Sequence, residues 1–170
     1  MLSFLKKFFI GKKIKEDSKN FQFAIYDDKS DAEDGCWYRI NGWKYPSNYL
    51  RMESKNNKGW EKISPYEEKV MGIEYEGRWK NFLAMGDQDK FKMFLEKEPT
   101  NAYDKYAIKV MGSALIDGQS VIKQIGYLQK DTAELLKNEN DLKVGPASVS
   151  LPYEGKPLVL KISILTKSNK

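Results

Sequence analysis

Residues 95–110, LEKEPTNAYDKYAIKV, decide the fold, because they run from one apolar strand through a polar turn into a second strand. Glu98-Pro99 ends the first strand, since proline lacks the N–H that a sheet ladder requires and keeps the preceding residue extended. Thr100, Asn101 and Asp104 follow with short oxygen-bearing side chains, which stabilise turns by bonding the nearby backbone. After the turn, apolar and other residues alternate as in a half-buried strand.

The same turn presents a candidate binding pair. Tyr103 and Asp104 stand side by side within it, and loops on a rigid scaffold are where proteins commonly display binding groups. This pair is therefore the first place to look for function.

Alternating patterns predict further strands on both sides of this stretch. They cover residues 70–75, 91–96, 121–128 and 158–165, and FQFAIY at 21–26 nearer the N-terminus. Asp131 followed by Glu134 predicts a helix over 131–140 that begins with a capping box. Strands at short spacing with little helix predict a mainly β fold, built as a small barrel or rolled sheet.

WYRINGWKY, residues 37–45, predicts a β-hairpin, because Asn41-Gly42 suits a two-residue type I′ turn. The pairing would set Ile40 against Trp43 and Tyr38 against Tyr45, and would place Arg39 opposite Lys44. Two interpretations stay open. Either the like-charged pair meets a phosphate or an acidic neighbour, or the hairpin is an aromatic ribbon that covers an edge of the main domain.

The composition excludes several classes of enzyme. Histidine is absent from all 170 residues, so catalysis by Ser-His or Cys-His pairs is impossible. Cys36 is the only cysteine, which excludes an internal disulfide and a structural zinc site. A carboxylate pair of Asp104 and Glu98 is the remaining route to catalysis, but no nucleophile, cofactor motif or metal set accompanies it. We expect a non-enzymatic protein without cofactor, in the reducing cytoplasm.

The net charge of +5 comes from the first 15 residues, which hold five lysines and no acid. The rest of the chain has 24 basic and 24 acidic residues, so phosphate binding there requires a local patch. Apolar positions among the lysines predict an amphipathic helix over residues 1–16. Three roles stay open for this helix: a membrane-surface anchor, a basic arm for nucleic acid, or a terminal helix that is docked on its own domain or frayed.

Three motifs resemble the HIRAN domain family over about residues 66–167. They are VMGIEYEG at 70–77, FLEKEPTNAYDKYAIKV at 94–110 and IGYLQKDTAELL at 125–136. The family implies an OB-like β-barrel with helical additions, which would occupy residues 65–170 after an aromatic-rich β extension at 17–64. It also implies capture of single-stranded DNA, notably at a free 3′ end, and an association with DNA repair.

Carried over by position, the resemblance implies a site of defined residues. Tyr75 and Tyr103 would stack on bases, and Asp104 would accept the hydrogen bond of a terminal 3′ hydroxyl. Asn101 would help to hold the end, and Lys130 would meet a backbone phosphate. Such stacking is tolerant of base sequence, and a carboxylate accepts from a hydroxyl, which distinguishes a terminus from a continuous backbone.

Three positions depart from the family pattern. Glu74 stands where DNA-binding relatives carry arginine, which exchanges attraction for repulsion near a phosphate. Tyr127 replaces a histidine, which preserves stacking or a hydrogen bond but not a titratable cation. Ala102 replaces a proline before the tyrosine. Candidates to restore the missing positive charge are Arg78, Lys80 and Arg39.

Two functions from different classes follow. The first is a non-catalytic protein that binds single-stranded DNA near a 3′ end. The alternative is an adaptor, in which the barrel is a protein-binding scaffold and residues 1–15 recruit it to a membrane surface or a partner.

Overall fold

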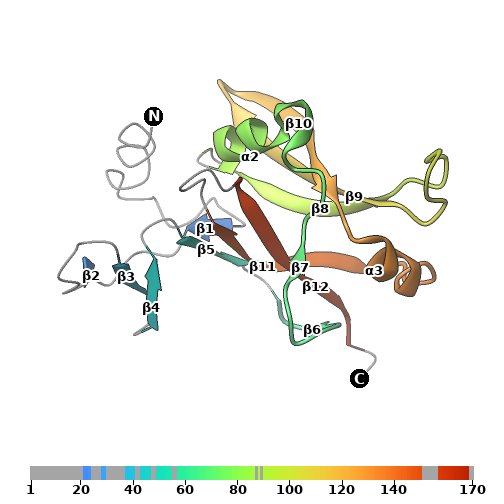
Figure 1. The fold of residues 1–170 in the computed structure, drawn as a ribbon, viewed down its shortest axis with the longest axis horizontal. Coiled ribbons are helices and arrows are strands. Elements are labelled where there is room, and N and C mark those ends of the chain that lie inside the picture. The colour runs from blue at the N-terminus through green and yellow to red at the C-terminus, as the bar shows by residue number, and fades with distance from the viewer. Residues whose placement is uncertain are drawn as a thin grey trace.

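The protein is mainly β, with little helix, as predicted. A computed structural model describes residues 21–23, 28–29, 37–40, 43–46, 49–54, 57–86, 88, 90–150 and 157–168. The described strands form three sheets (Figure 1), and the helices are α2 (Arg78–Gly86) and α3 (Lys130–Leu135), with a 3₁₀ turn, η1 (Tyr75–Gly77), directly before α2.

The largest sheet has the strand order β1-β5-β11-β12-β6, and β7 also pairs with β12. Its antiparallel strands are β1 (Phe21–Phe23), β5 (Tyr49–Ser54), β6 (Trp60–Lys62), β7 (Glu68–Lys69), β11 (Leu142–Ser150) and β12 (Val159–Lys167). The register of β11 against β12 shifts between Val144 and Ala147. Gly145-Pro146 lies at this irregularity, where a proline without N–H is tolerated.

The second sheet holds the turn-forming stretch 95–110. Its order is β10-β9-β8, with β8 at Lys92–Lys97, β9 at Ile108–Ile116 and β10 at Gln119–Tyr127. The strands predicted at 91–96, after the turn, and at 121–128 are confirmed. β8 ends at Lys97, directly before Glu98-Pro99, as the proline requires.

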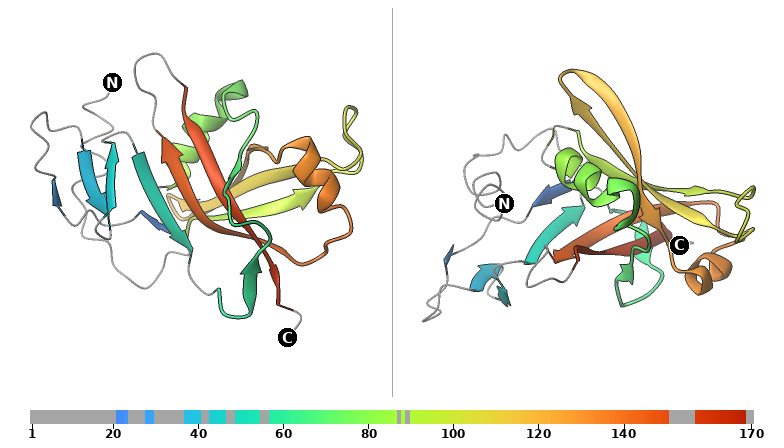
Figure 2. Two further views of the ribbon diagram at one scale, coloured as in Figure 1. Left: turned by 60° about the horizontal axis from the view of Figure 1, so that its bottom comes forward. Right: turned by 45° about the horizontal axis from the view of Figure 1, so that its top comes forward.

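Among the described residues, one isolated backbone bridge connects the segment after β7 with the end of β10. Met71 N–H donates to the Tyr127 carbonyl at 2.8 Å, and Tyr127 N–H donates to the Met71 carbonyl at 2.9 Å. Gly126 permits this approach, because a Cβ there would lie 2.5 Å from the Met71 carbonyl oxygen and 2.5 Å from Val70 Cγ1. The views in Figure 2 show β8–β10 crossing β11 and β12. In the described part of the chain the sheets are not closed into a complete barrel.

A single hydrophobic core fills the space between the sheets and α2. Phe82 of α2 and Phe91, both fully buried, meet edge to face with centroids 6.1 Å apart. Ile125 of β10, Leu160 of β12 and Met52 of β5 belong to the same cluster. Burial of this shared cluster holds the second sheet and its turn on the first.

The predicted strand over 70–75 is wrong beyond Met71. Gly72 has φ +69°, a conformation that stops the strand, and Tyr75 begins η1 instead of lying on a strand. The buried side chains here are Val70 and Ile73, spaced three residues apart, whereas a strand face requires a spacing of two. α2, β5 and β11 were not predicted from the sequence.

The helix near residue 131 is confirmed, but its predicted cap is wrong. α3 begins at Lys130 with Gln129 at the N-cap position, no side chain caps it, and it ends at Leu135. Leu128 is buried and its N–H donates to the Ile108 carbonyl at 3.0 Å. This contact fixes where the chain leaves β10, so the helix begins before Asp131. Asp131 instead lies in the first turn, where its negative charge interacts favourably with the positive end of the helix dipole.

The predicted hairpin is confirmed in its register. β3 (Trp37–Ile40) pairs with β4 (Trp43–Pro46), with Ile40 opposite Trp43, Tyr38 opposite Tyr45 and Arg39 opposite Lys44. β2 (Asp28–Lys29) adds on the other side of β3 and sets Asp28 opposite Arg39. An acidic residue therefore neighbours the like-charged pair.

The helix predicted at residues 1–16 and the turn Asn41-Gly42 lie outside the described residues. The boundaries proposed near residues 16 and 64 stay predictions. In the part of the chain that is described, no helix has the length and apolar character needed to cross a membrane.

Candidate nucleic-acid interface

The turn between β8 and β9 is closed by backbone hydrogen bonds at both ends. Glu98 N–H donates to the Ala107 carbonyl at 2.8 Å, and Ala107 N–H donates to the Asp104 carbonyl at 3.0 Å. Asn101 N–H donates to the Glu98 carbonyl at 3.0 Å. The turn is therefore an ordered extension of the sheet.

Two predicted side chains fix the inside of this turn. Asn101 Oδ1 accepts from the backbone N–H groups of Tyr103 and Asp104, at 3.0 and 3.1 Å. Asp104 Oδ1 accepts from the N–H of Tyr106 at 2.9 Å. These are the local bonds for which short polar side chains are favoured in turns. The prediction that short polar side chains hold the turn is confirmed for Asn101 and Asp104 but not for Thr100, whose side chain makes no hydrogen bond among the described residues.

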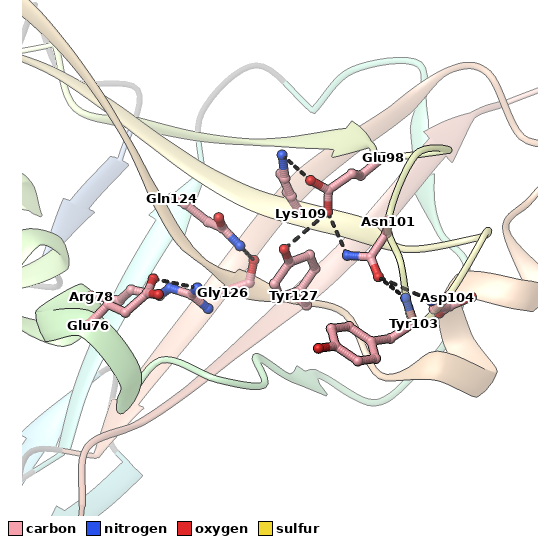
Figure 3. A network of polar contacts seen from close by, with 10 residues as sticks. All are labelled: Glu76, Arg78, Glu98, Asn101, Tyr103, Asp104, Lys109, Gln124, Gly126 and Tyr127. Carbon is pink, nitrogen blue, oxygen red and sulfur yellow. Dashed lines mark hydrogen bonds and ion pairs between the residues drawn. The ribbon is translucent and has the colours of Figure 1, made fainter.

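Tyr103 lies on this fixed turn with 95% of its surface exposed. Figure 3 shows its ring outside the network of drawn contacts, whereas its N–H belongs to that network. An exposed ring gains nothing from core packing and loses conformational freedom when its backbone is fixed. Its position makes a flat apolar face available to a partner.

Glu98 is the centre of the network in Figure 3. Its Oε2 accepts from Asn101 Nδ2 at 2.8 Å and from the Tyr127 hydroxyl at 3.0 Å, and its Oε1 pairs with Lys109 Nζ at 2.6 Å. The Asn101 bond first, then those from Lys109 and Tyr127, lower the pKa of the Glu98 carboxyl, and the carboxylate raises the pKa of Lys109. Glu98 thus connects the turn to β9 and β10.

Arg78 lies on the other side of Tyr127. Its Cζ is 5.7 Å from the centroid of the Tyr127 ring, Nη1 donates to the Gly72 carbonyl at 3.2 Å, and Nη2 pairs with Glu76 at 2.9 Å. A guanidinium over a tyrosine face is a favourable cation–π contact. Tyr75 is close by, since its N–H donates to the same Gly72 carbonyl at 3.3 Å. Its side chain is 64% exposed.

Hydrogen bonds and ring contacts thus join most of the predicted site residues. Asn101, Tyr103, Asp104 and Tyr127 belong to one continuous network, and Tyr75 reaches it through the Gly72 carbonyl and Arg78. Two predicted positions lie at the margin.

Lys130 and Glu74 are these marginal positions. Lys130 begins α3, three residues after Tyr127, and its side chain is exposed. Glu74 is also exposed and occupies the N-cap position of η1 without a capping hydrogen bond. Both charges therefore face solvent beside the network.

Glu98 and Lys109 were missed as members of the site. From the sequence, Glu98 was interpreted as part of a strand stop and as one half of a carboxylate pair, and Lys109 had no role. The strand register is the feature that could have identified them, because Lys109 lies opposite both Glu96 of β8 and Tyr127 of β10. Strands paired in this way bring the end of β8 and the start of β9 onto one face.

Within the described residues, no group of three or more metal-ligating His, Cys, Asp or Glu side chains is present. The chemistry available to the site is hydrogen bonding, stacking and charge.

The fold and the site define a small mainly β binding module, with aromatic and polar side chains on a fixed turn. The comparison with protein families matches residues 66–167 to the HIRAN domain, which is more than half of the chain. The protein therefore belongs to the HIRAN domain family. This family has an OB-like fold and is a nucleic-acid-binding module, which supports DNA binding by this chain. Comparisons with curated proteins and with solved structures found no match.

Proposed function

We propose that this protein binds single-stranded DNA and holds its 3′ end at the turn between β8 and β9. The observation that carries the proposal is the position of Tyr103, whose exposed ring stands on a hydrogen-bonded turn beside Asp104. Stacking on such a ring accepts any base, because every base has a π-face. Tyr75, also exposed, is the second stacking surface.

Asp104 is the group that recognises the terminus. Its Oδ1 is occupied by the N–H of Tyr106, and among the described residues Oδ2 has no hydrogen-bond partner. A carboxylate oxygen accepts from a terminal 3′ hydroxyl but has nothing to accept from a phosphodiester. Asn101 orients this carboxylate through the Asp104 N–H.

Positive charge comes from Arg78, which stands in for the family arginine, and from Lys130, whose role the family resemblance implies. The guanidinium of Arg78 lies over Tyr127, donates to the Gly72 carbonyl and pairs with Glu76. Its side chain is 15% exposed, so it supplies a partly covered and partly neutralised cation beside Glu74. Lys130, exposed at the start of α3, meets a backbone phosphate. Tyr127 supports the site through two contacts: its hydroxyl donates to Glu98, and its ring contacts the guanidinium of Arg78.

The test is a fluorescence-anisotropy titration of short oligonucleotides at several salt concentrations. We expect binding at low salt that weakens as salt rises. Tyr103→Ala should weaken binding by about 1 to 3 kcal/mol, the usual contribution of one stacked base, without changing the melting temperature, since the ring is exposed. Tyr66→Ala, at a tyrosine that is 78% exposed outside the site, is the matched control.

Two results would overturn the proposal: no binding at low salt, or unchanged binding after loss of both Tyr75 and Tyr103. The adaptor alternative depends on residues 1–15, which lie outside the described residues, and it stays a prediction. Liposome flotation with and without these residues tests its membrane version.

A further inference from the structure

Two lysines lie against the ring of Tyr106, next to the proposed end-binding turn, and a third lysine bonds to the backbone of one of them. Lys105 Nζ lies 4.8 Å and Lys137 Nζ lies 5.1 Å from the centroid of this ring. Lys97 Nζ donates to the backbone carbonyl of Lys137 at 2.8 Å. The three ammonium groups come from the end of β8, from the turn, and from the segment after α3.

These lysines differ from Lys109 and Lys167 in lacking an acidic partner. Lys109 is paired with Glu98 and Lys167 with Asp141. For Lys97, Lys105 and Lys137, no described carboxylate lies within ion-pair distance, and all three side chains are exposed. Glu134 and Glu139 are near Lys137 in sequence but make no ion pair with it.

Gathering three cations at one place without an anion costs electrostatic energy, even at the surface. The face of Tyr106 offsets part of this cost for two of them. The arrangement leaves a local excess of positive charge in a chain whose residues 16–170 hold equal numbers of basic and acidic side chains. An anion with several acceptor oxygens would complete it, and phosphate is bound by lysine in this way.

The position of this cluster indicates which phosphate it would meet. The N–H of Tyr106 donates to Asp104 Oδ1. Tyr106, whose ring contacts two of the lysines, therefore lies two residues after Asp104, the residue proposed to bind the terminus. A strand held by its end at Asp104 has its next linkages close to the turn. Lys105 belongs to the turn itself, and Lys97 bonds to the backbone of Lys137, so the three lysines lie close to the turn that would hold the end.

We propose that Lys105 and Lys137 on the ring of Tyr106, together with Lys97 at the backbone of Lys137, form a second phosphate-binding site, which binds the backbone of the strand next to its 3′ end. This inference rests on the proposed function. Two parts of one surface then have different roles. Tyr103 and Asp104 bind the terminus, and the lysines supply salt-dependent affinity for the adjoining backbone.

The experiment compares the full chain with the Lys105→Gln/Lys137→Gln double variant, using single-stranded oligonucleotides that end in a free or a blocked 3′ hydroxyl. The slope of log Kd against log salt should become shallower by about 0.7 for each phosphate that the variant no longer neutralises. The ratio of the two dissociation constants should not change, since Asp104 is intact. Lys92→Gln/Lys123→Gln, at two exposed lysines on β8 and β10, is the matched control and should leave the slope unchanged.

A second measurement locates the contact on the strand. Single phosphates near the 3′ end are replaced one at a time with neutral methylphosphonates. At the linkage that the lysines contact, the replacement should weaken binding by the wild type and have little effect on the double variant, whereas a linkage contacted by Lys130 should affect both proteins alike. An unchanged slope in the double variant, with end discrimination intact, overturns the lysine site and leaves the proposed function standing. An equal effect on both proteins at every methylphosphonate position also overturns it. Absence of binding by the wild type overturns both proposals.

Discussion

The fixed turn makes Asn101 the most informative position to change. Asn101→Ala removes two hydrogen bonds from backbone N–H groups to Oδ1 and one from Nδ2 to Glu98. Each such bond contributes about 1 kcal/mol net. Because the turn is partly exposed, water can replace part of this loss, and we expect the free energy of unfolding to fall by about 2 kcal/mol. In a domain of this size that lowers the melting temperature by about 4 to 8 °C.

Differential scanning calorimetry or thermal circular dichroism measures this change, and oligonucleotide titration measures its effect on binding. We expect affinity to fall as well, since Tyr103 and Asp104 lose the bonds that hold their backbone. Asn101→Asp keeps the Oδ1 acceptor but sets a carboxylate against Glu98, so it should also be destabilised. Thr100→Ala, at an exposed neighbour, should change stability by less than about 0.5 kcal/mol. A melting temperature of Asn101→Ala equal to that of the wild type would refute the reasoning.

Three further changes test the surrounding structure. Gly126→Ala should destabilise by about 1 to 3 kcal/mol in urea unfolding, since its Cβ would collide with the Met71 carbonyl and Val70; unchanged stability would mean that the bridge is looser than described. Because the pKa of Glu98 is lowered by folding, its carboxylate stabilises the protein above the ordinary pKa, and this stabilisation is lost as the pH falls through the lowered value. Glu98→Gln should therefore lose less stability than the wild type between about pH 7 and pH 3. Equal losses in the two proteins would contradict the network. Ser163 Oγ is buried without a hydrogen-bond partner among the described residues, so Ser163→Ala should leave stability unchanged or raise it by up to about 1 kcal/mol, and a clear loss of stability would reveal a hydrogen bond to this hydroxyl.

The strands of the second sheet were predictable because local rules and tertiary packing agree there. Pro99 ends β8, and at the start of β9 Ile108 and Val110 are buried while Lys109 between them is half-buried, as the alternation predicts. β11 escaped prediction, since Gly145-Pro146 interrupts its pattern and the bulge that accommodates the pair is visible only from its pairing with β12. The segment before α2 was misassigned for the opposite reason: its residues alternate, but the positive φ of Gly72 bends the chain.

In the candidate site, the residues on the turn were predictable from the sequence, whereas the residues that hold them were not. Asn101, Tyr103 and Asp104 are adjacent in the chain, so their grouping requires no knowledge of the fold. Glu98 meets Tyr127 from 29 positions away, and Arg78 reaches the face of that ring. Such contacts depend on the register of β8, β9 and β10, which a single sequence does not supply.

The central claim is that Asp104 reads a free 3′ hydroxyl, and one measurement tests it most directly. Dissociation constants are determined for two oligonucleotides that differ only in having a 3′ hydroxyl or a 3′ hydrogen at the last sugar, with the wild type and with Asp104→Ala. The wild type should prefer the hydroxyl by about tenfold, equal to about 1.4 kcal/mol, and Asp104→Ala should bind both alike. Equal affinity of the wild type for the two ends, or a preference that survives in Asp104→Ala, would contradict the account.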